Sequence, residues 1–365
     1  MRPQTNELPP VAPDGASFYT LTEQARGQAY AALAREALEA WGLASADLAL
    51  IKQRENAVFA VTADNGERAV LRIHRAGYHS DAALRSELEW MAALADFGVA
   101  TPAVRPTLGG ALLTTASVPA VPEPRQVDLL AWVEGEPLGT IEGGVEDLDT
   151  ARDSYRLVGE LVARMHDFAA AWLLPEGFQR HAWDTDGLLG EQPFWGRFWE
   201  LPALSQRQRE RLLLARELAR VALNNYGQGA DRYGLIHADP LPENFLRGAD
   251  GAVRVIDFDD GGFGWLLFDF ATALFFYVGE DCFDDLLAAM IDGYRRVREL
   301  PPEFERQLPL FLLLRGFSYL GWVHTRENSE LAREITPMLV EGVSALAEDF
   351  ITHYPHIENH TANRA

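Results

Sequence analysis

The strongest constraint on the fold of this chain is one segment, residues 235–260, in which charged loops alternate with short apolar runs. It reads LIHADPLPENFLRGADGAVRVIDFDD, and the runs Leu235–Ile236 and Val253–Ile256 are typical of buried strands. A cluster of polar residues beside apolar strands predicts a functional site. The alternative interpretation is a polar loop that joins two buried strands and whose acids are solvated. The polar side chains of the segment that matter here are His237, Asp239, Asn244, Asp257, Asp259 and Asp260.

The spacing of three of these side chains predicts a metal-dependent reaction centre. Asn244 follows Asp239 by five positions, and Asp257 follows Asn244 by thirteen. One loop is therefore able to hold Asp239 and Asn244, while the next hairpin returns Asp257 to the same place. A carboxylate near a strand end is able to accept a proton from a hydroxyl group, and the oxygens of Asn244 and Asp257 are ligands that Mg²⁺ prefers.

The part of the chain before residue 134 predicts a small lobe built on an antiparallel sheet. The dipeptide Asn65-Gly66 is a strong hairpin signal, because both residues tolerate positive φ. Asp81 is expected to cap a helix that Gly98 ends. The expected elements are a helix over 23–41, strands over 48–52, 57–62 and 68–74, a helix over 81–97 and a strand over 127–133.

The remainder of the chain predicts a larger, mainly helical lobe. Together the two parts predict an α+β, bilobal architecture with a site between the lobes. Apolar residues recur at helical spacing over 153–168, 205–226, 283–299, 303–324 and 330–353. The expected divisions are a flexible leader over 1–22, an N-terminal lobe over 23–133, a C-terminal lobe over 134–354 and a tail over 355–365.

Charge and cysteine content exclude several classes of protein. Lys and Arg number 32 and Asp and Glu number 54, which gives a formal net charge of −22. Such a surface repels phosphate backbones and anionic lipids, so we expect no nucleic-acid or membrane partner. Cys282 is the only cysteine, which rules out an internal disulfide and a thiolate zinc cluster and favours a reducing, cytoplasmic compartment.

Three further patterns exclude other readings of the sequence. Residues 1–15 are polar and rich in proline, so they do not predict a secretory signal. The most apolar stretch, Leu308–Val323, is interrupted by Arg315 and is shorter than the roughly 20 residues that span a bilayer, which predicts a buried helix. No GxxxxGKS or GxxxxGKT motif occurs, and the glycines at 261, 262 and 264 follow the wrong kind of element for a dinucleotide-binding loop.

The polar segment resembles the catalytic and metal-binding loops of the protein-kinase-like superfamily, in which His-x-Asp-x-x-x-x-Asn precedes an Asp-Phe pair. It is more closely similar to the aminoglycoside phosphotransferase family, which includes choline, homoserine and methylthioribose kinases. Ala238 stands where that family usually has glycine, and Pro240 and Leu241 replace the common leucine and histidine. The resemblance covers roughly residues 45–325 and is strongest over 235–271.

The resemblance implies a protein-kinase-like fold and an ATP- and Mg²⁺-dependent transfer of phosphate to a hydroxyl group. Asp239 would be the catalytic base, and His237 would brace its loop. Arg72 would replace the usual phosphate-contacting lysine and pair with Glu87. The alternatives are a solvent-facing strand arginine and a rival partner, Glu89. The resemblance also implies that Asn244 and Asp257 bind the metal and that Asp269 is a structural brace. Ala131 and Val133 would lie in the hinge and bind the nucleotide. Asn56 would belong to a turn at 55–57 that replaces a phosphate lid.

The sequence does not determine the acceptor. Residues 178–199 bring aromatic and acidic side chains together, which either suits an amine-bearing alcohol or marks a packing insertion. The residues expected on the acceptor side are Asp259, Asp260, Trp183 and Trp195. We therefore expect a kinase for a small-molecule hydroxyl group, of the aminoglycoside, choline or homoserine type. A bacterial serine/threonine protein kinase of the stress-response type and a nucleotide-binding pseudokinase are the alternatives, and the oligomeric state is not specified.

Overall fold

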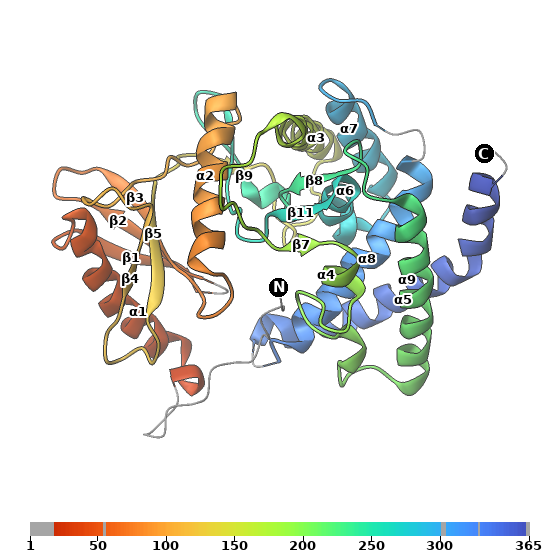
Figure 1. Ribbon diagram of the computed structural model, residues 1–365, viewed down its shortest axis with the longest axis horizontal. Coiled ribbons are helices and arrows are strands. Elements are labelled where there is room, and N and C mark those ends of the chain that lie inside the picture. The colour runs from red at the N-terminus through yellow and green to blue at the C-terminus, as the bar shows by residue number, and fades with distance from the viewer. Residues whose placement is uncertain (1–17, 54–55, 301–303, 328, 363–365) are drawn as a thin grey trace. The chain divides into compact units, whose positions relative to one another are not determined.

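The structure of the protein is a computed structural model that describes residues 18–53, 56–300, 304–327 and 329–362 (Figure 1). Most of the predicted leader, at positions 1–17, and Glu55 of the predicted phosphate-lid turn lie outside these residues. The chain divides into two compact units. The first comprises the described residues up to Glu136, with Leu174–Gln179 and Leu246–Ile256, and the second comprises Pro137–Leu173, Arg180–Phe245 and the residues from Asp257 onward.

The first unit is built on an antiparallel sheet, whose strands run from red to yellow in Figure 1. Within the described residues its five strands lie in the order β1–β2–β3–β5–β4, and all neighbouring pairs are antiparallel. Gly66 has a φ of +84° in the turn between β2 and β3, which agrees with the predicted hairpin. The strands are β1 (Asp47–Gln53), β2 (Ala57–Thr62), β3 (Arg68–Ile73), β4 (Leu113–Ala116) and β5 (Arg125–Ala131).

Helix α1 (Glu23–Leu38) packs on this sheet. Leu33 and Leu38 of the helix share one buried cluster with Phe59, Leu71 and Leu129 of the strands. Burial of a large apolar side chain stabilises a fold by about 1.5–3 kcal/mol, so this cluster is a main source of stability for the unit. The shorter elements of the chain are the 3-10 helices η1 (Phe18–Thr20) and η2 (Glu39–Trp41) and the strands β6 (Glu136–Pro137), β9 (Phe245–Arg247) and β10 (Val253–Val255).

Helix α2 (Asp81–Phe97) shows one error in the sequence-based prediction, which named Asp81 as its cap. The N-cap is Ser80, whose hydroxyl accepts a hydrogen bond from Ala83 N at 3.1 Å. Ser80 takes this role because its extended backbone leaves the hydroxyl beside the first N–H groups of the helix. Asp81 is the first helical residue, and its carboxylate accepts a hydrogen bond from Gln126 Nε2 at 2.8 Å. Gly98 ends the helix at a φ of +98°, as predicted.

The second unit is mainly helical, and its helices α3 and α7 cross at very short range. A Cβ atom on Gly159 would lie 2.1 Å from Met290 O. A Cβ atom on Gly293 would lie 1.9 Å from Arg156 O, so both positions require glycine. The helices are α3 (Leu148–Ala171), α4 (Thr185–Leu189), α5 (Gln206–Tyr226), α6 (Leu266–Leu274), α7 (Phe283–Arg295), α8 (Phe304–His324) and α9 (Glu330–Ala362), with the 3-10 helices η3 (Phe198–Glu200), η4 (Pro242–Asn244) and η5 (Phe275–Tyr277).

A short sheet in the second unit brings two loops together. Within the part of the chain that the structure describes, its three strands lie in the order β7 (Ala182–Trp183), β11 (Gly262–Trp265) and β8 (Tyr233–Ile236). Strands β8 and β11 are antiparallel, and Ile236, the last residue of β8, pairs with Gly262, the first residue of β11. The loop that follows β8 and the loop that precedes β11 therefore lie at the same edge of the sheet.

The predicted combination of an antiparallel sheet with a mainly helical remainder is confirmed. The long predicted helices are found, although α3 begins before residue 153, α7 ends at Arg295 and not at residue 299, and α9 continues past residue 353. Helix α6 is not predicted by periodicity, because all of its residues are buried and no polar face marks it. Among the described residues, we find no helix whose length and apolar character would let it cross a membrane.

Candidate active site

The loop that follows β8 carries Asp239 and is held by the side chain of Asp269. Asp269 lies in α6 and is fully buried. Its carboxylate oxygens accept hydrogen bonds from the backbone N–H groups of His237 at 3.1 Å and Ala238 at 2.7 Å. His166 Nε2 lies 3.0 Å from Oδ2 of the same carboxylate. These are the contacts that the predicted brace requires, while the effect of Asp269 on a reaction stays a prediction.

The backbone of Ala238 is left-handed, with a φ of +63°. This conformation costs an L residue roughly 1–2 kcal/mol, whereas glycine adopts it without that cost. The hydrogen bond to Asp269 and a second one, from Thr272 Oγ1 to Ala238 O at 3.3 Å, hold the strained residue in place. The neighbouring His237 is buried against Phe258, and its Nδ1 accepts a hydrogen bond from the backbone N–H of Asp239 at 3.3 Å.

The carboxylate of Asp239 is contacted on both oxygens. Asn244 Nδ2 donates to Asp239 Oδ2 and to Asp239 O, in each case at 2.9 Å. Arg315 Nη2 lies 3.4 Å from Asp239 Oδ1. The side chain of Asp239 keeps 20% exposure, whereas that of Arg315 has none. A base at this position is therefore fixed in orientation and still accessible to a substrate.

The acids of the two loops form one electrostatic cluster. Burial raises the pKa of Asp239, the charge of Arg315 opposes the rise, and the charge of Asp257 adds to it. Burial and the charges of Asp239 and Asp259 raise the pKa of Asp260 well above its usual range. Asp257 thus lies near enough to Asp239 for its charge to act on that carboxylate. Such a cluster favours the binding of a cation.

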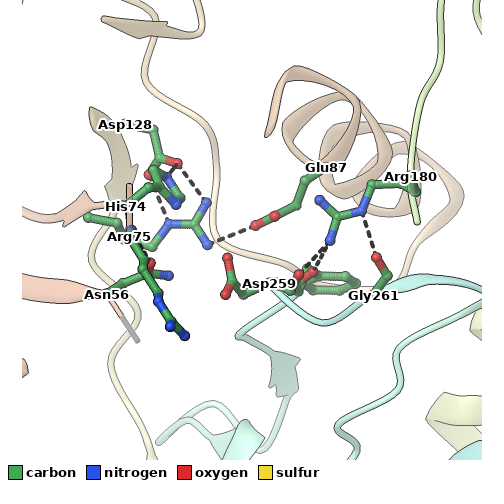
Figure 2. Close-up of polar contacts among 10 residues, drawn as sticks. Asn56, His74, Arg75, Glu87, Asp128, Arg180, Asp259 and Gly261 are labelled. Carbon is green, nitrogen blue, oxygen red and sulfur yellow. Dashed lines mark hydrogen bonds and ion pairs between the residues drawn. The ribbon is translucent and has the colours of Figure 1, made fainter. Parts of the chain in front are cut away.

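The loop that precedes β11 is held by an arginine clamp. Arg180 Nε donates to Gly261 O at 2.6 Å (Figure 2). Arg180 Nη2 donates to Asp259 O at 2.6 Å and to Phe258 O at 3.0 Å. Asp257, where this loop begins, has a left-handed φ of +64° and an exposed side chain. The clamp therefore supports a strained backbone beside the carboxylate of Asp257.

The residues predicted for the acceptor side make contacts with the protein itself. Trp183 is fully buried, stacks on Phe268 and donates from Nε1 to Asp260 O at 2.8 Å. The ring of Trp195 lies 4.7 Å from the guanidinium carbon of Arg315. Asp259 is buried in the clamped loop. A role of these residues in binding an acceptor stays a prediction.

In the first unit, Arg72 belongs to a buried cluster of ion pairs. Its Nη1 lies 2.8 Å from Glu87 Oε1, and its Nε and Nη2 lie 2.9 and 2.7 Å from the two oxygens of Asp128. His74 Nε2 lies 2.7 Å from Asp128 Oδ2 (Figure 2). Arg72 is only 6% exposed, which excludes the solvent-facing alternative. A phosphate that contacts this guanidinium would have to compete with two carboxylates.

The other residues predicted to bind the nucleotide also lie in the first unit. Ala131 and Val133 border a cavity of about 460 Å³, which is within the range of small-molecule sites. Ala131 N donates to Ala103 O at 2.7 Å. Asn56 Oδ1 accepts a hydrogen bond from Arg75 N at 3.2 Å, which ties the residue before β2 to the second residue after β3. Nucleotide binding by these residues stays a prediction.

The donor set of the second unit fits a hard divalent cation. The amide nitrogen of Asn244 is used on Asp239, so its amide oxygen remains available for a metal, and Asp257 offers an exposed carboxylate. Among the described residues, no group of three or more His, Cys, Asp or Glu is arranged to hold a metal ion by itself. Few protein ligands are normal for Mg²⁺ when nucleotide phosphates and water complete its coordination. The residues therefore fit a metal that binds together with a nucleotide.

Two arginines of this site are absent from the sequence-based prediction of functional residues. Arg315 is 76 positions from Asp239, and Arg180 is 79 positions from Asp259. The sequence marks Arg315 only as a charge inside an apolar helix, and this unusual position for an arginine is the one local sign of a functional role. For Arg180 no local pattern distinguishes it from a surface arginine.

Comparisons with known proteins agree with this arrangement. A family model described as the phosphotransferase enzyme family matches residues 47–300. The amicoumacin kinase of Bacillus subtilis (strain 168) is 25% identical over 299 residues, which cover 79% of this chain and 83% of that protein.

Solved structures show the same fold. The structure of a microcompartment-associated aminopropanol kinase matches with a TM-score of 0.79 and 33% sequence identity, over 89% of this chain and 98% of that one. The amicoumacin kinase hAmiN, in complex with AMP-PNP, Ca²⁺ and Ami, matches with a TM-score of 0.65 and 19% identity, over 82% and 88%. The kinase-like fold class and the predicted enzyme class, a phosphotransferase with an alcohol group as acceptor, are thereby confirmed. The chain belongs to the phosphotransferase enzyme family and is a small-molecule kinase.

Proposed function

We propose that the chain transfers the terminal phosphoryl group of ATP, with Mg²⁺, to a hydroxyl group of a small alcohol that carries an amine. The observation that supports this most directly is the contact between Asp239 and Asn244 on a braced loop, next to the loop of Asp257. Phosphoryl transfer needs a base and oxygen ligands in this kind of arrangement. The kinase solved with AMP-PNP and Ca²⁺ supports the use of a nucleotide and a divalent cation.

In the proposed reaction, Asp239 orients the acceptor hydroxyl group and takes its proton as the oxygen bonds to phosphorus and the bond to ADP breaks. Asn244 holds Asp239 through its amide nitrogen and, with Asp257, offers oxygen to the metal. When bound, Mg²⁺ supplies positive charge at the nucleotide phosphates. Arg72, oriented by Glu87 and Asp128, is proposed as a further cation for the phosphates. Positioning and charge dominate because the transition state is loose.

A cavity of the second unit is proposed to receive the acceptor. Its volume is about 1040 Å³, and its wall includes Ile141 and Tyr277. Glu243 connects it to the catalytic loop, because Glu243 Oε2 accepts a hydrogen bond from Ile141 N at 3.2 Å. After burial, the charge of Glu243 is among the causes that raise the pKa of both Tyr277 and Asp239. The acidic residues of the cavity wall are Glu146, Glu280, Asp281 and Glu341.

Carboxylates around a partly apolar wall suit an alcohol that carries a protonated amine. The aminopropanol kinase that is 33% identical to this chain supports the same class of acceptor. The decisive experiment measures ADP release by the purified chain with ATP and Mg²⁺. The acceptors tested are several amino alcohols, the diol analogue of each amino alcohol, and a peptide mixture. We expect release with amino alcohols, and release at least about 100-fold slower with Asp239→Asn. Release only with peptides would favour a protein kinase and contradict the proposal.

Cys282 gives a second test that does not depend on activity. It lies in the wall of the same cavity and is the only cysteine of the sequence. Alkylation by iodoacetamide, followed by mass spectrometry of the intact chain, should slow several-fold when an active amino alcohol is present and remain unchanged with its diol analogue. Equal rates under both conditions would place the acceptor elsewhere without removing the phosphotransferase activity.

A further inference from the structure

Arg315 is a buried charged residue whose contacts do not account for its position by a gain in stability. It lies in the apolar helix α8 and has no exposed surface. Its Nη2 donates to Tyr319 Oη at 3.0 Å and lies 3.4 Å from Asp239 Oδ1. Within the described residues, its Nε and Nη1 have no hydrogen-bond partner. A buried guanidinium whose donors are incompletely matched destabilises a fold, and an apolar side chain would suit this position better.

Arg216 shows the contacts of a structural buried arginine in the same unit. It lies in α5, is 7% exposed, and its guanidinium carbon is 4.3 Å from the ring of Trp199. Its Nε donates to Leu189 O at 2.8 Å, and its Nη2 donates to Gly190 O at 3.0 Å. Arg216 thereby joins α5 to the end of α4. Arg216 also pairs with the exposed carboxylate of Glu191 at 2.8 Å. Arg315 instead faces the carboxylate of the proposed base, and a phenol and aromatic rings surround the rest of its guanidinium.

Three aromatic rings hold the guanidinium of Arg315 in place. Its central carbon lies 4.2 Å from the ring of Tyr319, 4.7 Å from that of Trp195 and 5.5 Å from that of Phe268. Thr325 Oγ1, from the segment just after α8, lies 3.1 Å from Trp195 O, which is a contact with the backbone of Trp195 and not with its ring. Aromatic faces attract a cation but carry no net charge, so they orient the guanidinium without neutralising it. Its positive charge therefore acts on Asp239.

We propose that Arg315 is a positioning residue for phosphoryl transfer, which together with Asn244 fixes the Asp239 carboxylate with Oδ1 directed at the acceptor hydroxyl group. This inference rests on the proposed function, in which Asp239 is the base. Asn244 holds Oδ2 at 2.9 Å. Arg315 faces Oδ1 at 3.4 Å, longer than the roughly 2.7–2.9 Å of a charged hydrogen bond. Oδ1 is thus oriented but not saturated, and it remains able to accept a hydrogen bond from a hydroxyl group.

Steady-state kinetics of the full chain with Arg315→Met test the proposal, and Arg216→Met is the matched control. We expect kcat of Arg315→Met to fall about 100-fold, KM for ATP to change less than about threefold, and the urea midpoint to stay at or above that of the wild type. Arg315→Lys should recover about tenfold in kcat, because it restores positive charge near Oδ1. Arg216→Met should lower the urea midpoint and leave kcat unchanged, because Arg216 contacts only groups that the proposed reaction does not use. These are two backbone carbonyls, the ring of Trp199 and the carboxylates of Glu191 and Glu217.

A double-mutant cycle shows whether Arg315 acts through Asp239. In the Asp239→Ala background, Arg315→Met should change kcat less than about twofold, since the group it positions is gone. The inference is overturned if the kcat loss of the double variant equals the product of the two single-variant losses. It is also overturned if Arg315→Met keeps a wild-type kcat. A wild-type kcat in Asp239→Ala alone overturns the proposed base instead, so the two failures are distinguishable.

Tyr319→Phe provides the same test if Arg315→Met does not fold. This change removes the hydroxyl that accepts from Arg315 Nη2 and keeps the ring. We expect kcat to fall about three- to tenfold in the wild-type background and to stay constant in the Asp239→Ala background. A fall in both backgrounds, or in neither, overturns the inference.

Discussion

At the scale of single residues, the site depends on carboxylates that the protein keeps close together. Burial and mutual repulsion raise the pKa of Asp239 and Asp260, and the charge of Arg315 opposes that rise in both. A cation from solution would relieve the same repulsion. We therefore expect each carboxylate of the cluster to affect both the chemistry of the site and its affinity for a metal.

Removal of the proposed base should affect turnover far more than binding. We expect Asp239→Ala to lower kcat by roughly 10²–10⁴, the range for a positioned general base, with KM for ATP within a few-fold of wild type. The shape-conserving Asp239→Asn should show the same loss, because it retains the size of the side chain and not its basicity. Initial rates of ADP release measure both variants. Near-normal turnover in either variant would remove Asp239 from its proposed role.

Removal of the proposed metal ligand should affect nucleotide binding. We expect Asp257→Ala to abolish the Mg²⁺-dependent part of nucleotide affinity, because the metal loses a charged oxygen ligand. Asp257→Asn is the matched control, since asparagine tolerates the left-handed backbone at this position and keeps one oxygen. It should retain partial metal dependence. Calorimetric titration of a nucleotide with and without Mg²⁺ makes the comparison, and equal metal dependence in Asp257→Ala and wild type would contradict it.

At the scale of elements, close backbone contacts and cross-strand pairs fix how neighbouring elements pack. The register of β8 with β11 brings the two polar loops to one sheet edge. In the first unit, Arg72 and Asp128 stand directly opposite each other on β3 and β5. The glycines of α3 and α7 let two helices approach within backbone contact. These three arrangements depend on pairs of elements rather than on one segment.

The α3–α7 crossing should not tolerate a methyl group. We expect Gly293→Ala to destabilise the second unit by about 1–3 kcal/mol or more, because the new Cβ would overlap Arg156 O. Gly342→Ala in α9 is the control, since a Cβ there meets nothing within 4 Å, and it should stabilise the helix by about 0.5–1 kcal/mol. Urea unfolding followed by circular dichroism measures both. Equal free energies of unfolding for Gly293→Ala and wild type would show that the helices shift without cost.

The β3–β5 ion pair should make stability depend on acidity. Although burial opposes ionisation, Arg72 and His74 hold the pKa of Asp128 well below its usual range. The unfolded-state pKa is about 3.9, so this stabilisation is complete above about pH 4 and is lost as the pH falls toward the folded-state pKa. We expect Asp128→Asn to lower the free energy of unfolding by about 3–5 kcal/mol at pH 7, and the difference from wild type to shrink below pH 4.

Urea unfolding between about pH 2.5 and pH 7 tests this dependence on Asp128. The exposed Asp96 of α2 provides the control, and Asp96→Asn should track wild type over the whole range. A constant difference between Asp128→Asn and wild type at every pH would show that the ion pair does not couple stability to protonation.

At the scale of the whole molecule, the dominant property is a net charge of −22. A strongly acidic protein repels anions and raises the local concentration of small cations around it. This long-range effect adds to any direct contact between an acceptor amine and the acids of the second-unit cavity. It is also screened by salt, which separates it from direct contacts.

Salt should therefore weaken the use of a cationic acceptor selectively. Between about 20 and 300 mM NaCl we expect kcat/KM for an amino alcohol to fall several-fold, because the Debye length shortens from roughly 20 Å to below about 10 Å. The diol analogue should show no such trend. Initial rates at fixed ATP and Mg²⁺ measure both, and parallel salt dependence for the two compounds would show that the field does not steer the acceptor.

Local patterns were sufficient to predict most elements and the central motif. The hairpin at Asn65-Gly66, the helix end at Gly98 and the loop that joins Asp239 to Asn244 all follow from backbone preferences and hydrogen bonds within a few residues. The same local reasoning chose Asp81 over Ser80 as a cap, because both residue types cap helices and stand side by side.

The sequence by itself determined most of the long elements, the spacing of the polar motif and the acidity of the chain, since each of these depends on neighbours along the chain or on composition. Only the tertiary structure decided that Arg315 faces Asp239, that Arg180 clamps the loop of Asp257, and that Asp128 pairs with Arg72. Arg315 is 76 positions from Asp239, Arg180 is 79 positions from Asp259, and Asp128 is 56 positions from Arg72. The physical reason is that packing between elements selects which distant side chains meet, and no periodicity along one segment records that choice.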